Sequence, residues 1–313
     1  MPFCYLLSFT PEEAELAQAE ARALTAPPVA AAHPRLHMTD ARADITRAAY
    51  IKAGGELWAS ATCFEALLEE ITSRGLGADR FRIEVAKLPP KPATPSPEIA
   101  ARTAGALQGQ PDLAAPLEDL LVAATEGAWH LGRIFSRSDA GYLRHAHRPQ
   151  AYSSALPTRV ARAMVNLVAR PGDTIVDPMC GSGTIALEAW SVGVRAMSFD
   201  LNPRLASATA RNLAHFGYPA WVAAADALTL CGRYGAVVTD PPYGRFSDRP
   251  PGLYEALFAQ AARLAPRLCV VTAEDTTPLL EQAGFRVTCL ARVGERGLVR
   301  HVHVALAGAA PSA

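Results

Sequence analysis

The chain has 313 residues, 50% of them apolar, and its 30 basic and 30 acidic residues give a formal net charge of zero. This length is sufficient for two or three domains with full hydrophobic cores. The six cysteines form no Cys-x-x-Cys pair, which argues against a zinc knuckle and against a disulfide framework. We therefore expect no bound metal.

The chain also lacks the sequence features of a membrane or secreted protein. No apolar run approaches the roughly 20 residues that a membrane-spanning helix needs. The first 25 residues contain four glutamates and one arginine, unlike a secretory signal peptide. We therefore expect a cytoplasmic protein with no membrane partner.

The first part of the chain predicts short strands and helices in alternation. Apolar or alternating runs indicate strands, and apolar residues at helical spacing after polar residues indicate helices. We expect strands at 3–7, 81–85, 120–124 and 128–135, and helices at 11–24, 56–72 and 96–107. The proline-rich stretch 89–95 is typical of a stiff connection.

A strand, a glycine-rich loop and a helix follow one another at 174–190. The run 174–177 predicts the strand, and Pro-Met-Cys-Gly-Ser-Gly-Thr at 178–184 leads into the helical pattern. Gly181 and Gly183 let the backbone pass close to a ligand, and the helix N-terminus presents free N–H groups, so the loop suits a nucleotide-like cofactor. The stretch 181–186 also fits a dinucleotide fingerprint, with Asp200 as the ribose-binding acid, so a nicotinamide-dependent dehydrogenase is one interpretation.

Acids at the ends of successive strands favour a different cofactor. Asp177 directly precedes the glycine loop, and Asp226 ends a third short strand at 221–225. An acid at Asp177 suits an ammonium group rather than a pyrophosphate. S-adenosylmethionine has an aminoacyl end, a ribose and an adenine but no phosphate. We therefore expect Asp177 near its methionine part, Asp200 on the ribose and Asp226 on the adenine amine, all outside the carboxyl ends of a doubly wound sheet. Any one of these acids alone can instead be a helix cap.

The apolar strand 236–238 is followed by Thr-Asp-Pro-Pro-Tyr-Gly at 239–244. This pattern suits methylation of an exocyclic amine on a nucleobase. Because the lone pair of such an amine is delocalised into the ring, hydrogen-bond acceptors aimed at its N–H groups are needed to withdraw the pair from conjugation. Asp240 supplies a carboxylate, Pro241 a main-chain carbonyl and Tyr243 an aromatic face for a flipped base. A proline-rich turn after a strand is the alternative interpretation.

The motifs at 177–184 and 240–244, in this order and at this separation, resemble those of the THUMP-containing RNA methyltransferases, especially the tRNA guanine-N2 group that acts on guanosine 10. The resemblance implies an α/β chain with a C-terminal Rossmann-like class I methyltransferase domain, preceded by smaller α+β ferredoxin-like and THUMP-like domains. It also implies direct transfer of a methyl group from S-adenosylmethionine to N2 of a guanine, with tRNA as the partner. We expect a ferredoxin-like domain at 1–75, a THUMP-like domain at 76–139, a linker at 140–153 and the methyltransferase domain at 154–313.

Three sets of site residues follow from the motifs, from the resemblance and, for the arginines, from the clustering of positive charge. The catalytic set is Asp240, Pro241 and Tyr243. The cofactor set is Asp177, Cys180, Gly181, Gly183, Thr184, Asp200, Asp226 and Ala227. The substrate set is Pro242, Gly244, Arg144, Arg148 and Arg245.

Zero net charge is unusual for a protein that binds a phosphate backbone. Arginines nevertheless gather near the expected domain junction and, as Arg245 and Arg249, just after the second motif. We expect these groups to contact RNA phosphates, the junction group being Arg133, Arg137, Arg144 and Arg148. A solvated basic linker is the alternative interpretation of the junction group.

Other functions stay open on the sequence alone. An adenine-N6 methyltransferase acting on DNA or rRNA would use the same acceptor geometry. The dehydrogenase interpretation of the glycine loop and an RNA-binding protein with an inactive methyltransferase domain are the alternatives from other classes.

Overall fold

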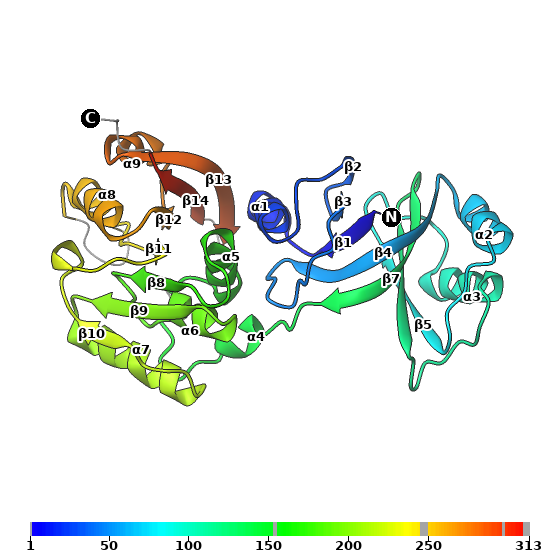
Figure 1. Cartoon of the computed structure of the whole chain (residues 1–313), viewed down its shortest axis with the longest axis horizontal. Helices are drawn as coiled ribbons and strands as arrows, with labels where there is room; N and C mark the ends of the chain where they lie inside the picture. The colour runs from blue at the N-terminus through cyan, green and yellow to red at the C-terminus, as the bar shows by residue number, and fades with distance from the viewer. Residues whose placement is uncertain (1, 153–154, 245–249, 296–297, 309–313) are drawn as a thin grey trace. The chain divides into compact units, whose positions relative to one another are not determined.

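The computed structural model describes residues 2–152, 155–244, 250–295 and 298–308. Two compact units make up the chain, and within these described residues each unit is built on one seven-stranded sheet (Figure 1). Unit 1 comprises Met1–Phe9, Ala21–Thr46 and Tyr50–Asp139. Unit 2 comprises Thr10–Glu20, Arg47–Ala49 and Ala140–Ala313.

Unit 1 has the strand order β2-β3-β1-β4-β7-β6-β5. Its strands are β1 (Phe3–Leu7), β2 (Ala30–His33), β3 (Leu36–Thr39), β4 (Ile51–Ala61), β5 (Phe81–Lys87), β6 (Glu118–Ala124) and β7 (Trp129–Arg137). Helices α2 (Phe64–Ser73) and α3 (Ser96–Ala106) supply Phe64, Ile71 and Ile99 to a core that also holds Leu120 and Val122 of β6. The predictions of strands at 3–7, 81–85, 120–124 and 128–135 and of a helix at 96–107 are confirmed.

The prediction of a helix from residue 56 is wrong in its first part, because β4 continues to Ala61 and α2 begins at Phe64. Gly54 and Gly55 obscure this strand in the sequence, since neither adds a side chain to the alternating pattern. Both permit close packing: a Cβ atom at Gly54 would lie 2.8 Å from Cε1 of Tyr5, and one at Gly55 would lie 3.3 Å from the main-chain oxygen of Arg133. The strand pairs with β1 on one side and β7 on the other. One sheet thus runs through 1–75 and 76–139, which the sequence had suggested to be separate domains.

Unit 2 contains a doubly wound sheet with its flanking helices. Its strands are β8 (Thr174–Asp177), β9 (Arg195–Asp200), β10 (Val222–Ala224), β11 (Ala236–Thr239), β12 (Arg267–Thr272), β13 (Phe285–Glu295) and β14 (Leu298–Ala307). Its helices are α4 (Tyr142–His145), α5 (Thr158–Val168), α6 (Thr184–Ser191), α7 (Pro203–His215), α8 (Leu253–Leu264) and α9 (Thr277–Gln282), with a short 3-10 turn η2 (Ala227–Thr229).

The strand order of this sheet is β10-β9-β8-β11-β12-β14-β13 (Figure 1). Strands β8 to β12 pair in parallel, and β14 pairs antiparallel with β12 and with β13. The chain leaves β8 for β9 on one side and returns through β11 on the other. In such sheets ligands bind outside the carboxyl ends of the strands where the order reverses. The expected Rossmann-like fold of this part of the chain is confirmed.

One core of unit 2 lies between α8 and the central strands. Tyr254, Leu257 and Phe258 of α8 pack with Val237 of β11 and Val270 of β12, and all five are almost fully buried. Helix α6 contacts both α5 and α7. Against the sheet, α5 contacts β12, α6 contacts β9, and α7 contacts β9 and β10. Most residues of the apolar helix α6 are therefore buried, which fixes the loop that precedes it.

The N-terminal segment that belongs to unit 2 is held by a buried carboxylate. The predicted helix at 11–24 consists of a 3-10 turn η1 (Pro11–Glu13) and α1 (Ala14–Leu24). Glu20 of α1 is fully buried and accepts hydrogen bonds from the side-chain amide of Asn166 at 2.6 Å and from the backbone N–H of Ala49 at 2.8 Å. Part of the expected ferredoxin-like domain at 1–75 thus belongs to unit 2.

Candidate active site at the carboxyl ends of the strands

The glycine loop between β8 and α6 is open at one glycine and packed at the other. Gly181 and Gly183 both have left-handed backbone angles, with φ of 54° and 84°. A Cβ atom at Gly181 would meet nothing within 4 Å, whereas one at Gly183 would lie 2.7 Å from Cγ2 of Thr209. Gly183 is therefore needed for packing, and Gly181 leaves space in which a ligand can approach the backbone.

Helix α7 holds this loop through two side chains that the sequence did not single out. Thr209 donates its hydroxyl to the carbonyl of Gly181 at 2.8 Å, and Asn212 donates its amide to the carbonyl of Ser182 at 2.8 Å. Both side chains are fully buried. They lie three residues apart, on one face of the helix, so they contact consecutive residues of the loop. The i, i+3 spacing of Thr209 and Asn212 was the sequence signal that could have indicated a shared role for the two side chains. The same spacing of polar residues also occurs in helices without such a role.

Asp177 ends β8 and is 1% exposed. Its carboxyl group accepts hydrogen bonds from the Thr239 hydroxyl at 3.0 Å and from the Met179 N–H at 3.2 Å. Burial raises the pKa of Asp177 to about 8, and the charges of Asp240 and Asp200 act in the same direction. A buried carboxyl group of this kind is stabilised in its ionised form by a cationic ligand group.

The neighbouring loop residues fit a polar ligand as well. The hydroxyl of Ser182 is buried and has no hydrogen-bond partner among the described residues. Thr184, the first residue of α6, is also buried. Cys180 lies 3.5 Å from the Thr209 hydroxyl through its sulfur, and burial raises the pKa of its thiol far above the usual range. Cys180 is therefore a packed thiol rather than a nucleophile.

Asp200 and Asp226 lie at the carboxyl ends of β9 and β10, respectively. Asp200 accepts the Gly181 N–H at 2.9 Å through one oxygen and the Asn202 N–H at 2.8 Å through the other. Asp226 caps η2 by accepting the Leu228 N–H at 2.9 Å, while Ala227 beside it is buried. Asp200 thus ties the end of β9 to the glycine loop, and Asp226 marks the end of β10.

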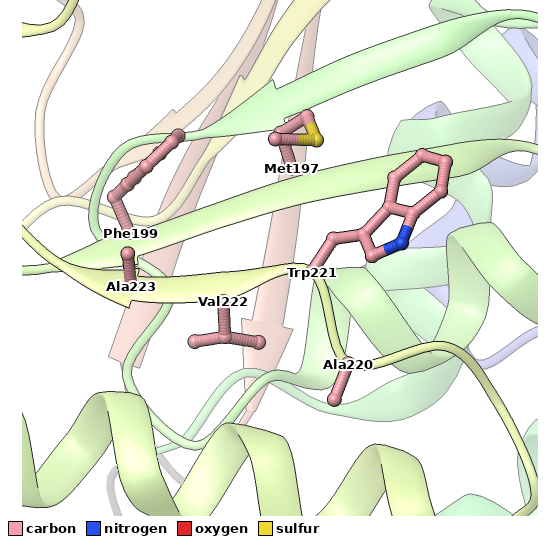
Figure 2. Close-up of a pocket in the computed structure, with 6 residues that line it drawn as sticks. All are labelled: Met197, Phe199, Ala220, Trp221, Val222 and Ala223. Atoms are coloured by element: carbon pink, nitrogen blue, oxygen red, sulfur yellow. The ribbon is translucent and has the colours of Figure 1, made fainter.

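An apolar hollow of about 460 Å³ lies along the same two strands. Figure 2 shows Met197 and Phe199 of β9 on the same side as Trp221, while Val222 points to the opposite side, where α7 runs. The connection from β10 to β11 contains only the turn η2, so no longer helix of the described chain covers this side of β10. The sequence did not predict this hollow, because it results from a short connection rather than from a motif.

The second motif lies directly after β11. Tyr243 donates its hydroxyl to the carboxylate of Asp240, and Tyr254 of α8 donates to the main-chain oxygen of Pro242 at 3.3 Å. Asp240 is half-buried, Pro241 is buried and Gly244 is exposed with φ of 79°. The motif is therefore a compact turn whose tyrosine is fixed by its own aspartate.

Burial raises the pKa of Asp240 to about 6, although the Tyr243 hydroxyl and the charge of Arg300 on β14 lower it. Burial and the neighbouring Asp240 raise the pKa of Tyr243 far above its ordinary value. Near neutral pH the pair is thus an ionised carboxylate beside a neutral phenol. This carboxylate is the acceptor that the sequence interpretation required, and Arg300 is a charge near it that the sequence did not reveal.

The predicted arginines have different environments. Arg144 is exposed and donates to the Tyr218 hydroxyl at 3.0 Å. Arg148 is 8% exposed and donates to the main-chain oxygen of His145 at 3.2 Å, and its contact with RNA phosphates stays a prediction. Arg133 and Arg137 are paired with acids, namely with Glu56, Glu118, Glu84 and Asp119. Arg245 and Arg249 lie outside the described residues.

Two further observations concern metals and membranes. Among the described residues, no group of three or more histidine, cysteine or acidic side chains is placed to hold a metal ion. Within the same part of the chain, every helix is too short or too polar to cross a bilayer.

Comparison with known proteins agrees with this fold. The crystal structure of TrmN from Thermus thermophilus matches with a TM-score of 0.52 and 22% sequence identity, covering 98% of this chain and all of the other. At this identity the similarity establishes the fold.

Curated relatives match parts of the sequence. The tRNA (guanine(10)-N2)-dimethyltransferase of Methanothermobacter thermautotrophicus is 39% identical over 115 residues, which cover 36% of this chain and 34% of the relative. The enzyme of the same name from Pyrococcus abyssi is 32% identical over 152 residues, 45% of this chain and 46% of the relative. The chain thus spans between a third and a half of the length of these two relatives.

A protein family described as the RMKL-like methyltransferase domain matches residues 145–299. The matched segment begins in α4 and includes the glycine loop, Asp200, Asp226 and the motif at 239–244. The dehydrogenase interpretation of the glycine loop finds no support in this match. Residues 145–299 are thus similar to the RMKL-like methyltransferase domain.

Proposed function

We propose that this chain is an S-adenosylmethionine-dependent RNA methyltransferase that transfers a methyl group to N2 of a guanine, in tRNA at the position-10 type of site. The observation that carries the proposal is the hydrogen bond from Thr239 to Asp177, because it joins the strand end before the glycine loop to the strand end before Asp240. The names of the curated relatives support guanine N2 and tRNA. A cytoplasmic location belongs to the same proposal.

The residues at the carboxyl ends of β8, β9 and β10 fit the cofactor. S-adenosylmethionine supplies a methyl group on a positively charged sulfur. Asp177 would hold the ammonium end, because its buried carboxyl group gains from a nearby cation. Gly181 leaves the backbone accessible, and the Ser182 hydroxyl is a polar group ready to bond. Asp200 and Asp226 would bind the ribose hydroxyls and the adenine amine.

The second motif would prepare the acceptor amine. The Asp240 carboxylate would accept one N–H of guanine N2, and the main-chain oxygen of Pro241 would accept the other, which draws the lone pair out of the ring. Asp240 would take the proton as transfer completes, and Tyr243 would stack on the base. The Tyr243 hydroxyl bonds to Asp240 in this structure, so guanine binding would exchange this hydrogen bond for one from the base.

Incubation of the protein with labelled S-adenosylmethionine and unmodified bulk tRNA, followed by nucleoside analysis, tests the proposal. N2-methylated guanosine is the expected product. N6-methyladenosine would overturn the assigned base and favour the adenine-N6 alternative. No incorporation into tRNA by a protein that still binds S-adenosylhomocysteine would reject tRNA as the substrate. Asp240→Asn is the matched control, because it keeps the shape of the side chain and removes its charge.

A further inference from the structure

We propose that helices α4 and α7 of unit 2 carry a docking surface for RNA phosphates. We call it the α4–α7 basic surface and define it by Arg144, His147, Arg204, Arg211 and His215, all of which are exposed. The choice of RNA as the partner rests on the proposed function. The evidence for the surface itself is the charge and the geometry of residues that lie outside the two sequence motifs.

The first observation is the absence of acids from the segments that form this surface. Residues 140–172 and 201–225 contain no aspartate or glutamate and seven arginines, of which three belong to the surface and two, Arg148 and Arg162, are buried. The whole chain has equal numbers of acidic and basic residues, so these two segments carry more positive charge than the chain as a whole. They leave one part of unit 2 positively charged in a protein whose net charge is zero.

The second observation is that two arginines of this surface, Arg144 and Arg211, bond to hydroxyl groups of the described chain. Arg144 donates to the Tyr218 hydroxyl at 3.0 Å, and Arg211 donates to the Ser207 hydroxyl at 3.0 Å. Arg133 and Arg137 of unit 1, by contrast, each bond to two acids. The surface arginines thus keep the charge that phosphate binding needs.

A neighbouring acid on α6 does not cancel this charge at the surface. Glu188 is fully buried and lies 2.8 Å from Arg162 and 2.7 Å from Nδ1 of His145. Arg162 is itself fully buried and also bonds to the Ser191 hydroxyl at 2.7 Å. The negative charge of Glu188 is therefore compensated inside the unit by a buried cation.

The third observation is that the segment after α4 is bonded to α7, and that α4 packs against the residue that follows α7. The backbone N–H of Gln150 donates to Asn212 at 2.8 Å, and Asn212 donates to the carbonyl of Gln150 at 3.0 Å. The rings of His145 and Phe216 pack edge to face with centroids 4.8 Å apart. The basic groups on the two segments therefore form a surface that is arranged before a ligand binds, which reduces the entropic cost of binding.

The position of α7 connects this surface to the candidate active site. Arg204 follows Asp200 by four residues, at the end of α7 that begins beside the carboxyl ends of the strands. Arg211 lies seven residues further on the same face of the helix, about 10 Å along its axis. The surface therefore extends from the side of the sheet where Asp200 lies toward the C-terminal end of α7. An RNA strand bound along it would have its next nucleotides near the site.

Binding of a fluorescein-labelled tRNA transcript at several salt concentrations tests the proposal. The variants are Arg144→Ala and the double variant Arg204→Ala with Arg211→Ala. Arg286→Ala is the matched control, because Arg286 is equally exposed but lies on β13, at the opposite edge of the sheet from β10. The double variant is expected to bind tRNA roughly tenfold or more weakly. Its salt dependence should flatten, with the slope of log K against log salt falling by about 0.7–0.9 for each phosphate that the variant no longer neutralises.

Wild-type affinity and slope in the double variant would overturn the proposal, and so would an equal loss in Arg286→Ala. The double variant is also tested with duplex DNA. Weaker binding of duplex DNA with unchanged binding of tRNA would overturn the proposal that the surface binds RNA. Unchanged affinity for S-adenosylhomocysteine shows that the variants remain folded. Methyl transfer is measured separately: if wild-type protein binds tRNA through this surface without methylating it, the proposed reaction fails and the surface stands.

Discussion

The hydroxyl of Thr239 donates to the buried carboxyl group of Asp177 at 3.0 Å. The two residues are 62 positions apart, and each ends a parallel strand, β8 or β11, that is paired with the other. Thr239 directly precedes Asp240, and Asp177 directly precedes the glycine loop. This hydrogen bond therefore sets the spacing between the predicted cofactor residues and the predicted catalytic residues.

Replacement of Asp177 by asparagine should stabilise the free protein and weaken cofactor binding. The raised pKa of Asp177, about 8 against an ordinary value of 3.8, means that the folded chain holds this proton more tightly than the unfolded chain. The free energy of unfolding contributed by this group therefore falls as the pH rises from the ordinary value to the raised one. Asp177→Asn removes this dependence, so its melting temperature should exceed that of the wild type by a few degrees near pH 8 and by less near pH 5.

Calorimetry with S-adenosylhomocysteine supplies the second measurement on Asp177→Asn. Removal of a charge-assisted hydrogen bond corresponds to roughly 10- to 100-fold weaker binding. Thr239→Val is the matched control, because it keeps the carboxyl group and removes one donor. Equal affinity of Asp177→Asn and wild type would show that Asp177 does not contact the cofactor.

Asp240→Ala should abolish most methyl transfer and leave cofactor affinity close to that of the wild type. The reason is that, in the proposed reaction, Asp240 accepts a proton and a hydrogen bond from the amine, whereas the proposed cofactor contacts lie at the ends of β8, β9 and β10. General-base residues contribute roughly 10²- to 10⁴-fold to the rate, and we expect a loss of kcat in this range. Tyr243→Phe separates the effect of the carboxylate from that of the hydroxyl that bonds to it. Near-native turnover by Asp240→Ala would exclude this role.

The rate of methyl transfer should rise with pH through the raised pKa of Asp240, which is about 6. Only the ionised carboxylate accepts both the hydrogen bond and the proton, so kcat/KM should increase up to this pH and then level off. The groups that act on Asp240 are Tyr243, Arg300 and Asp177, and removal of the Arg300 charge should move the rise to higher pH. Initial rates between about pH 5 and about pH 8 check this, and a flat profile over that range would contradict it.

Asn212→Ala should loosen the glycine loop. The substitution removes the amide that bonds to the carbonyls of Ser182 and Gln150 and leaves the buried carbonyl of Ser182 without this donor. An unsatisfied buried polar group costs about 1–3 kcal/mol, so the free energy of unfolding should fall by an amount in this range. Urea unfolding measures the loss, and S-adenosylhomocysteine affinity should fall with it. Ser207→Ala, on the exposed face of the same helix, is the control that should change neither quantity.

Several features of unit 2 were predictable from the sequence because they depend on local chemistry. The β-branched run 174–177, the two glycines and the helical pattern after Thr184 determine a strand, a loop and a helix within a short segment. The acids Asp177, Asp200 and Asp240 follow strand ends, and parallel strands place their carboxyl ends at one edge of a sheet. The sequence thus located most of the candidate site without any long-range information.

Prediction from the sequence failed where the environment of a side chain depends on residues that are distant along the chain. Arg148 lies only four residues after Arg144, yet Arg148 is buried and Arg144 is exposed. The strand character of β4 was hidden by Gly54 and Gly55, whose lack of a side chain has meaning only beside Tyr5 and Arg133.

By itself the sequence determined the class of the C-terminal fold, the glycine loop and the motif at 239–244, since each depends on neighbours along the chain. The tertiary structure alone decided that Thr239 bonds to Asp177, that Thr209 and Asn212 hold the glycine loop, and that Arg300 lowers the pKa of Asp240. It also bonded Gln150, which follows α4, to Asn212 of α7 and packed His145 of α4 against Phe216. The physical reason is that burial, desolvation and hydrogen bonding between distant segments are set by packing, which no local pattern in the sequence specifies.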